Sequence, residues 1–220
     1  MPKSLPPLTV QVLQTEATAF AALESIHGEP TLFGVDNGKT IGTYLDQKFQ
    51  NSLLERYDYP RGNAAKGIDL PGLNVDIKVT SIRQPQSSCP FRSARQKIYG
   101  LGYSLLVFVY EKHDDPASAT ARLNILHTIF IQAGRTADFQ TSSGILRLLE
   151  NQANREDILA FFEERMLPVD EITAGQLADE VMRQPPEVGC LTISNALQWR
   201  LQYSRAIEQA GAHSGILRLR

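Results

Sequence analysis

Two aspartates and a lysine of this chain have the residue types and spacing needed for metal-assisted chemistry. Asp69 precedes a Pro-Gly pair, and Asp76 and Lys78 follow it, two residues apart from each other. Mg²⁺ prefers oxygen ligands and is commonly held by one or two carboxylates together with substrate phosphate. A metal held in this way polarises a phosphoryl oxygen and acidifies a bound water, and a nearby ammonium stabilises the charge that develops. These residues could therefore hydrolyse a phosphodiester.

The spacing of these residues predicts a hairpin that brings them together. From Leu73 to Lys78 the residues alternate between apolar and polar, so alternate side chains should point to opposite faces of a strand. Asp76 and Lys78 then share one face, and Asp69 can fold back towards Asp76 across the turn. We predict that Asp69, Asp76 and the backbone carbonyl of Ile77 bind Mg²⁺, while Lys78 assists the attacking water. The competing interpretation is an exposed hairpin with a surface salt bridge.

The same residues carry a family resemblance. Asp69 followed by Asp76-Ile77-Lys78 resembles the PD-(D/E)-x-K signature of many type II restriction endonucleases, with Ile68 in place of the proline. The segments Val79-Thr80-Ser81 and Gln84-Pro85-Gln86-Ser87-Ser88 also resemble restriction-enzyme sequences. The resemblance rests on the alternating strand, the paired aspartate and these flanking segments taken together.

The resemblance covers about residues 35–132 and implies a function. It implies a Mg²⁺-dependent endonuclease that cuts double-stranded DNA at a short specific sequence. It also implies a homodimer, because a two-fold dimer presents two equivalent sites to the two strands of a palindrome. Nucleases of this superfamily often carry a further acidic residue on a helix before the catalytic strands. Asp46 is the first candidate for that residue, and Glu55 is the second.

The apolar residues predict the elements that surround the hairpin. An apolar stripe with a spacing of four residues predicts a helix over residues 39–56, and a further helix is expected over residues 8–22. Continuous apolar runs predict buried strands at residues 105–110 and 122–132. We therefore predict an α/β fold with a restriction-endonuclease-like core, in which helices flank a mixed sheet.

The last third of the chain is predicted to be mostly helical. Helical periodicity occurs in residues 144–151, 155–166 and 174–183, and Thr192 is a plausible N-cap for a helix to Gln209. On that last helix, Trp199 and Tyr203 are assigned to the core in preference to a DNA or dimer contact. We expect a single nuclease domain over residues 1–220. Its catalytic core would cover about residues 35–135, and its helical C-terminal region about residues 140–212.

The charges are distributed unevenly along the chain. Residues 77–110 contain no acidic residue and five basic ones, whereas residues 150–187 contain ten acidic residues and three arginines. This asymmetry favours one electropositive face for a phosphate backbone over charges spread around the surface. Gln and Arg can read base edges, and Ser, Lys and Arg can hold phosphates. The predicted DNA contacts, all from the polar segment 83–97, are Arg83, Gln84, Gln86, Ser87, Ser88, Arg92, Arg95 and Lys97.

Composition narrows the class of protein. The 220 residues are 42% hydrophobic and 21% charged, with a net charge of −2, as in ordinary globular proteins. No apolar run approaches the length of a membrane span, and residues 1–7 do not resemble a signal peptide, so a cytoplasmic location is expected. The two cysteines, Cys89 and Cys190, are not expected to form a disulfide in that compartment, and the four histidines show no zinc-site spacing.

Three alternatives to a restriction enzyme remain from the sequence. A junction-resolving or repair nuclease could use the same residues, although resolvases are typically smaller and more basic. A noncatalytic DNA-binding protein with a nuclease-like fold would have no need of Asp69, Asp76 and Lys78. An α/β enzyme acting on a small phosphorylated substrate is disfavoured because the sequence has no Gly-rich phosphate loop and no dinucleotide fingerprint.

Overall fold

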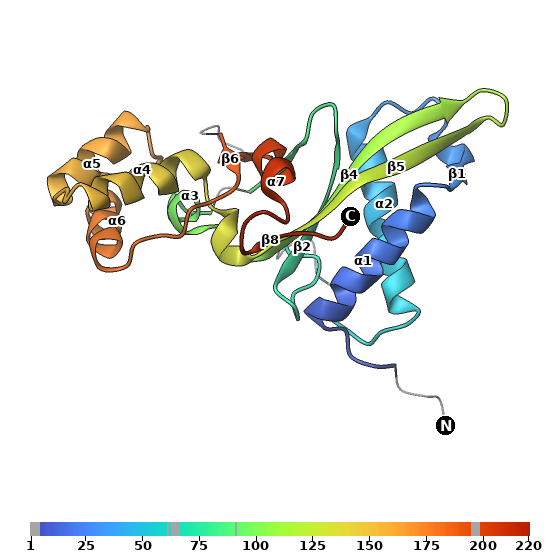
Figure 1. Ribbon diagram of the computed structural model, residues 1–220, viewed down its shortest axis with the longest axis horizontal. Helices are drawn as coiled ribbons and strands as arrows, with labels where there is room; N and C mark the ends of the chain where they lie inside the picture. Colours follow the sequence, from blue (N-terminus) through green and yellow to red (C-terminus); the bar gives the residue numbers. More distant parts are fainter. Residues whose placement is uncertain (1–4, 61, 63–66, 91, 195–198) are drawn as a thin grey trace. The chain divides into compact units, whose positions relative to one another are not determined.

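Figure 1 shows the chain as a computed structural model, which describes residues 5–60, 62, 67–90, 92–194 and 199–220. The chain divides into two compact units, which are described separately below. Unit 1 comprises Met1–Ser87, Leu105–Ile131 and Ala210–Arg220. Unit 2 comprises Ser88–Ser104 and Gln132–Gln209. The hairpin with the candidate catalytic residues belongs to unit 1.

Unit 1 is built on a five-stranded sheet with the order β1-β5-β4-β2, in which β8 also pairs with β5. Its centre is a long antiparallel hairpin of β4 and β5, in the register Leu105 opposite Ile131. The short strands β1 and β8 both run antiparallel to β5. The strand β2, which carries Asp76 and Lys78, pairs with β4 at the end of this order. The bounds are β1 (Gly28–Glu29), β2 (Val75–Ser81), β4 (Ser104–Asp115), β5 (Thr120–Ile131) and β8 (Ile216–Arg218).

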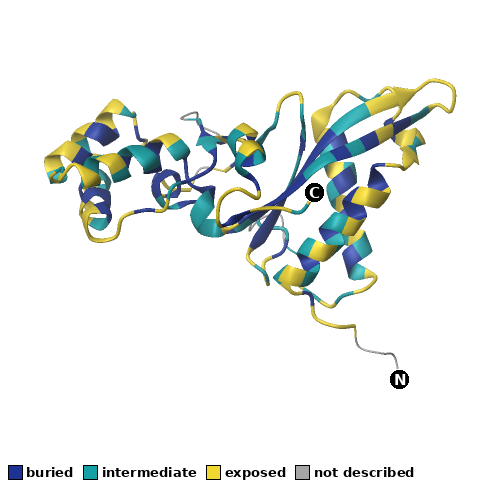
Figure 2. Cartoon of the chain, in the orientation of Figure 1, coloured by how far each residue is buried: buried dark blue, intermediate teal, exposed yellow. Residues whose placement is uncertain are grey.

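Two helices pack against this sheet, namely α1 (Val10–Glu24) on β5 and α2 (Gly38–Leu54) on β2. Each begins at a capping side chain, because Thr9 accepts a hydrogen bond from the Val12 amide and Asn37 from the Lys39 amide. Both helices bury an apolar stripe and leave the other side exposed (Figure 2). The rings of Phe20, Phe49 and Phe108 meet at the centre, with centroids 5.0 to 5.8 Å apart. The helices predicted at residues 8–22 and 39–56 and the strands at 105–110 and 122–132 are confirmed.

Glu29 connects the edge of this sheet to α2. Its Oε1 accepts hydrogen bonds from the amide and hydroxyl of Thr31 at 3.0 and 2.7 Å, in the short helix η1 (Pro30–Leu32). Its Oε2 accepts a hydrogen bond of 2.8 Å from the Tyr44 hydroxyl on α2. These bonds, that of Thr31 foremost, lower the pKa of Glu29 from 4.5 to about 2. The carboxylate therefore stabilises the fold in its ionised form.

We expect Glu29→Gln to lower the free energy of unfolding at pH 7 by roughly 1 kcal/mol, the value of a typical hydrogen bond near the surface. The pKa of Glu29 is lower in the folded chain, so its contribution is complete above pH 4.5 and is lost as the pH falls towards 2. The difference between variant and wild type should therefore shrink from pH 7 to pH 3 in urea unfolding. A constant difference would show that the ionised carboxylate contributes nothing.

Unit 2 is mostly helical, and its three long helices follow one another in the chain. These are α4 (Phe139–Glu150), α5 (Arg155–Glu164) and α6 (Glu171–Arg183), which confirms the helices expected in this region. Their core is formed by Ile145, Ile158, Phe162 and Val181, together with Ile98 from α3. A small sheet has the order β3-β7-β6, and the boundary between the two units falls within β3, after Ser87. The other elements are β3 (Gln86–Cys89), α3 (Arg95–Tyr99), η2 (Ala133–Thr136), β6 (Thr192–Ile193), β7 (Trp199–Gln202) and α7 (Ser204–Gln209).

The helix predicted from Thr192 to Gln209 is wrong. The chain forms β6 and β7 before a short helix at Ser204–Gln209, and residues 195–198 of the predicted helix lie outside the described part of the chain. Trp199, Leu201 and Tyr203 are fully buried, while the residues between them are exposed, which is the period of a strand. The C-terminal region of about residues 140–212 is therefore helical as far as α6, and beyond it two short strands precede the short helix α7. The core position of Trp199 and Tyr203 is confirmed.

The helices, the cysteines and the architecture can each be compared with what the sequence predicted. Among the helices that the described residues form, none has the length and apolarity that a membrane span requires. Cys89 and Cys190 are both buried and have free thiols. The α/β architecture with a helix-covered sheet agrees with the predicted restriction-endonuclease-like core.

Candidate active site

The predicted hairpin is present and places Asp69 beside Asp76. Leu70 and Val75 form an antiparallel bridge, in which the Leu70 amide donates to the Val75 carbonyl at 3.0 Å and the Val75 amide to the Leu70 carbonyl at 3.2 Å. Four residues turn between them, and Asn74 takes a left-handed conformation with a φ of 54°, which asparagine tolerates better than most residues. Asp69 and Asp76 flank this bridge on either side.

The carboxylate of Asp69 is fixed against β2. Its Oδ2 accepts a hydrogen bond of 2.9 Å from the amide of Ile77, between Asp76 and Lys78. On the strand itself, the Nζ of Lys78 lies 2.6 Å from Oδ2 of Asp76. The three predicted catalytic side chains are therefore within reach of one another, and the edge position of β2 leaves them on the border of the sheet.

Burial separates this arrangement from an ordinary surface ion pair. The side chain of Asp76 is 3% exposed and that of Lys78 is 20% exposed. The polar face of β2 is thus covered, whereas a hairpin with a surface salt bridge would leave it in solvent. Burial raises the pKa of Asp76 above its ordinary value, the charge of Lys78 opposes the rise, and the neighbouring Asp69 adds to it. Such a strongly perturbed carboxyl group is typical of functional sites.

A fourth side chain, Asp46 of α2, belongs to the same electrostatic cluster. Burial raises the pKa of Asp46 to about 6, and the charge of Asp69 raises it further, while Gln50 and Lys78 act in the opposite direction. Gln50 donates a hydrogen bond of 2.9 Å to Asp46 Oδ1. Glu55, the second candidate, is exposed at the C-terminal cap of α2 and shows no such relation to the hairpin. The structure therefore favours Asp46 over Glu55 as the helical acid.

The donor set of this cluster fits a hard divalent cation. Asp76 Oδ2 is buried, and no described residue donates a hydrogen bond of good geometry to it, although Lys78 Nζ is close. Within the described residues, no three acidic, histidine or cysteine side chains are placed closely enough to hold a metal ion on their own. A metal at this position would thus rely on two carboxylates completed by backbone and substrate oxygens, which is a common mode for Mg²⁺.

The predicted DNA-contact segment is divided between the two units. In unit 1, Arg83 and Gln84 are exposed and Gln86 is half-buried, and all three line a pocket beside β2. The turn is held by Thr80, whose Oγ1 accepts a hydrogen bond of 2.9 Å from the amide of Gln86. Ser87 lies in β3 and is half-buried. These residues follow β2 directly in the chain.

The other four predicted DNA-contact residues belong to unit 2. One of them forms an ion pair, and another is buried. Ser88 and Arg92 are exposed. Arg95 is exposed as well, but its guanidinium forms an ion pair of 2.6 Å with Glu180. Lys97 is only 5% exposed, and burial lowers its pKa. The segment is therefore not one continuous loop, because β3 and α3 form within it.

Sequence reasoning missed the other residues of that pocket, which come from β4 and from the chain before α2. Tyr110 was assigned only to a buried strand, and Asp36 and Lys112 were not singled out. Tyr110 and Lys112 are two residues apart on β4 and therefore share a face of the sheet. The alternation along this strand could have predicted that Tyr110 and Lys112 lie on the same side of the sheet.

An α/β core with two aspartates and a lysine at a sheet edge, and a further acid on an adjacent helix, is the arrangement expected of a nuclease of the restriction-endonuclease class. Comparison with known proteins agrees. Residues 7–218 match the family model of the type II restriction enzyme NspV. The type II restriction enzyme NspV of Nostoc sp. (strain ATCC 29411 / PCC 7524) is 63% identical over 210 residues, which are 96% of each chain.

The chain therefore belongs to the NspV family of type II restriction enzymes and is a site-specific endodeoxyribonuclease. The match extends over both structural units. No solved structure matches the chain.

Proposed function

We propose that Asp69 and Asp76 hold a Mg²⁺ ion at the edge of β2 and that DNA is cleaved there. The observation that supports this most strongly is the buried Oδ2 of Asp76, which has an ammonium nearby but receives no hydrogen bond of good geometry from the described residues. The backbone carbonyl of Ile77 is the proposed third oxygen, and Asp46 is an additional acid. When bound, the ion polarises the scissile phosphate and acidifies a water.

The protein side chains have separate tasks in this proposal. The Ile77 amide holds the Asp69 carboxylate in place, so that its second oxygen can face the ion. Lys78 keeps its ammonium beside Asp76 and donates hydrogen bonds to the attacking water or to a phosphate oxygen as negative charge develops. The covered face of β2 strengthens both interactions because water is partly excluded.

Arg83, Gln84 and Gln86 are the proposed DNA contacts of unit 1, because they surround a pocket next to the catalytic strand. Ser87, Ser88 and Arg92 are proposed to extend the contact along β3 and the chain that follows it. Arg95 can bind a phosphate only if it leaves its ion pair with Glu180. Lys97 is buried, so we assign it a structural role instead. Base-reading residues would set specificity, and phosphate-binding residues would set salt dependence.

We further propose that both units act together as one nuclease domain, because the family match spans them without interruption. A homodimer is proposed because two-fold symmetry would give each strand of a palindromic site an equivalent catalytic centre. A cytoplasmic location is consistent with a DNA substrate and with two free thiols.

Removal of the metal ion tests the proposed cofactor. Purified protein should cut a long sequenced DNA into discrete fragments with Mg²⁺ and leave it intact with EDTA, because the carboxylates alone cannot activate the phosphate. Gel electrophoresis shows the fragments, and sequencing of their ends gives the recognition site. Unchanged cutting in EDTA would contradict a metal-dependent mechanism, and a smear would indicate a nonspecific nuclease.

The same gel tests the assignment of the active site. Lys78→Ala should give no fragments, whereas Lys39→Ala, which removes an exposed lysine of α2, should cut like the wild type. Circular dichroism of both variants checks the fold. Normal cleavage by Lys78→Ala would show that the active site lies elsewhere.

A further inference from the structure

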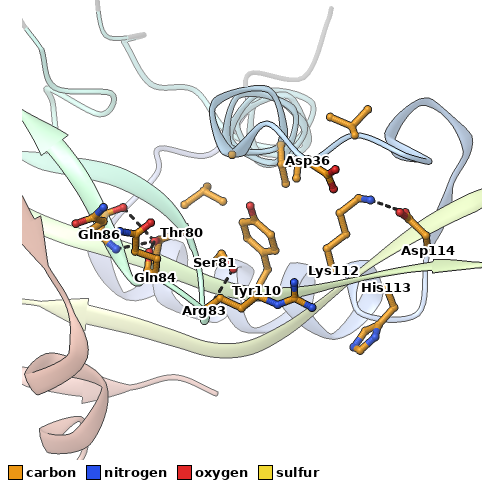
Figure 3. A pocket seen from close by; sticks show the side chains of 14 residues that line it. Asp36, Thr80, Ser81, Arg83, Gln84, Gln86, Tyr110, Lys112, His113 and Asp114 are labelled. Carbon is orange, nitrogen blue, oxygen red and sulfur yellow. Dashed lines mark hydrogen bonds and ion pairs between the residues drawn. The ribbon is translucent and has the colours of Figure 1, made fainter.

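A pocket of about 860 Å³ lies beside the end of β2 in unit 1 (Figure 3). It is bounded by the start of α2, by the last residues of β2 with the turn that follows, and by the second half of β4. None of its lining residues is among the four proposed catalytic residues. Val79, the first residue of β2 in its wall, directly follows Lys78, so the pocket begins further along the strand that carries the proposed catalytic residues.

Tyr110 provides this pocket with a hydroxyl that is not bonded to any residue in the described part of the chain. The residue is 3% exposed, yet no described residue forms a hydrogen bond with its hydroxyl, and its pKa is raised by burial alone. Figure 3 shows the hydroxyl pointing towards the middle of the pocket. A tyrosine hydroxyl can both donate and accept a hydrogen bond. Because this one faces an open pocket and no described residue occupies it, it is available to a ligand that enters the pocket.

The charges of the lining do not favour an anion. The lining contains two cations, Lys112 and Arg83, and two carboxylates, Asp114 and Asp36, and Lys112 forms an ion pair with Asp114. A phosphate group would therefore meet a site with no net positive charge. The lining instead combines hydrogen-bonding groups with apolar walls, which suits a flat uncharged ring with polar edges. A nucleobase has this character.

The recessed position of Tyr110 decides how a base could reach it. Base edges in a stacked duplex are read by elements that protrude into a groove, and a hydroxyl at the bottom of a pocket does not protrude. A base that has left the stack can enter such a pocket, where its edge forms hydrogen bonds and its faces contact apolar side chains. Asp76 and Thr80 are four residues apart on β2, about 13 Å at the usual rise of a strand. The pocket is therefore a few nucleotides from the proposed catalytic centre.

We propose that this pocket receives a nucleobase of the DNA substrate that has left the helix stack, and that the Tyr110 hydroxyl forms a hydrogen bond with its edge. The inference rests on the proposed function, because it places the base near the catalytic strand. It adds a specificity-determining residue and a binding site that the cleavage chemistry does not require.

The test uses duplexes that contain the cleavage site, with the fluorescent base 2-aminopurine at each position in turn. Binding is measured with protein that carries Lys78→Ala, which prevents cutting. One position should show a several-fold rise in fluorescence, as expected for an unstacked base. Adding Tyr110→Phe should weaken binding roughly three- to tenfold and reduce the rise, because one hydrogen bond is lost. The melting temperature should not fall, since the hydroxyl has no partner among the residues that the structure describes.

Two further variants separate a ligand contact from a structural effect. Tyr57→Phe removes a hydroxyl that donates to Glu16 at 2.7 Å outside the pocket, so it should lower stability without changing DNA binding. Gly38→Phe adds a ring to the pocket wall at a position where a Cβ meets no atom within 4 Å, so it should fold and abolish the fluorescence rise.

The outcomes are distinguishable from a failure of the proposed function. If wild-type protein cuts at a specific site but Tyr110→Phe and Gly38→Phe bind and fluoresce like their parent, the pocket proposal is overturned and the active-site assignment stands. Weaker binding with no fluorescence rise at any position would also overturn it, in favour of a sugar-phosphate contact. Failure of the wild type to cut any DNA would instead overturn the proposed function.

Discussion

Asp76→Asn is expected to reduce DNA cleavage by at least ~10³-fold and to leave the fold at least as stable as the wild type. The amide has the same shape but no charge, so it cannot bind the proposed metal ion as a carboxylate would. A metal contributes several kcal/mol to stabilisation of the transition state, and each ~1.4 kcal/mol corresponds to a factor of ten in rate. Single-turnover cleavage of a duplex with the recognition site measures the loss.

The same substitution is expected to maintain or raise the stability of the fold, although it abolishes most of the activity. The pKa of Asp76 is raised in the folded chain, so the ionised group opposes folding at neutral pH, and this opposition fades as the pH is lowered. Asparagine removes the buried charge, and thermal unfolding at pH 7 should give an equal or higher melting temperature. Asp58→Asn, at an exposed aspartate of the same unit, is the matched control and should change neither property. A marked loss of stability in Asp76→Asn would show that the residue is structural.

Trp199→Ala is expected to lower the free energy of unfolding by about 3–5 kcal/mol, because it leaves a large cavity. Trp199 is fully buried in β7, whereas Arg200 beside it is exposed, so Arg200→Ala should change stability by less than about 0.5 kcal/mol. Urea unfolding followed by circular dichroism gives both values. A similar small effect for both variants would contradict the placement of Trp199 in the core.

Leu201→Ala tests whether this segment forms the observed strand or the helix that the sequence predicted. In a helix, Trp199 and Tyr203 would share a face and Leu201 would point away from it, so its truncation would have little effect. In the strand, Leu201 is buried with Trp199, and we expect a loss of about 2–5 kcal/mol. A negligible loss would favour the helix.

The apolar spacing of the sequence was enough to predict most long elements and the candidate site. The stripe on α2 and the continuous runs in β4 and β5 are strong local signals, and the Pro-Gly turn with its alternating strand placed Asp69 beside Asp76. Alternation could not show that the polar face of β2 is covered. Thr80 on that face is 4% exposed because the turn of residues 84–86 folds back onto it, a tertiary contact with no local pattern.

The errors at the C-terminal end have a similar cause. Trp199 and Tyr203 are four residues apart, a spacing that both a helix and a strand allow on one face. Leu201 between them is also buried, which only the strand allows. The strand β8 has a single buried residue, Ile216, and it forms by pairing with β5, which is distant in the sequence. Its existence depends on a partner that no local pattern reveals.

The clustered acids come from separate segments of the chain, and this determines when the proposed active site can form in a cell. Asp46 comes from α2, Asp69 from the chain before the turn, and Asp76 from β2, which depends on β4 for pairing. The proposed cutting centre therefore cannot exist until the chain has been synthesised beyond β4 and has folded. A nascent or unfolding molecule would carry no nuclease activity, so protein turnover would not threaten the DNA around it.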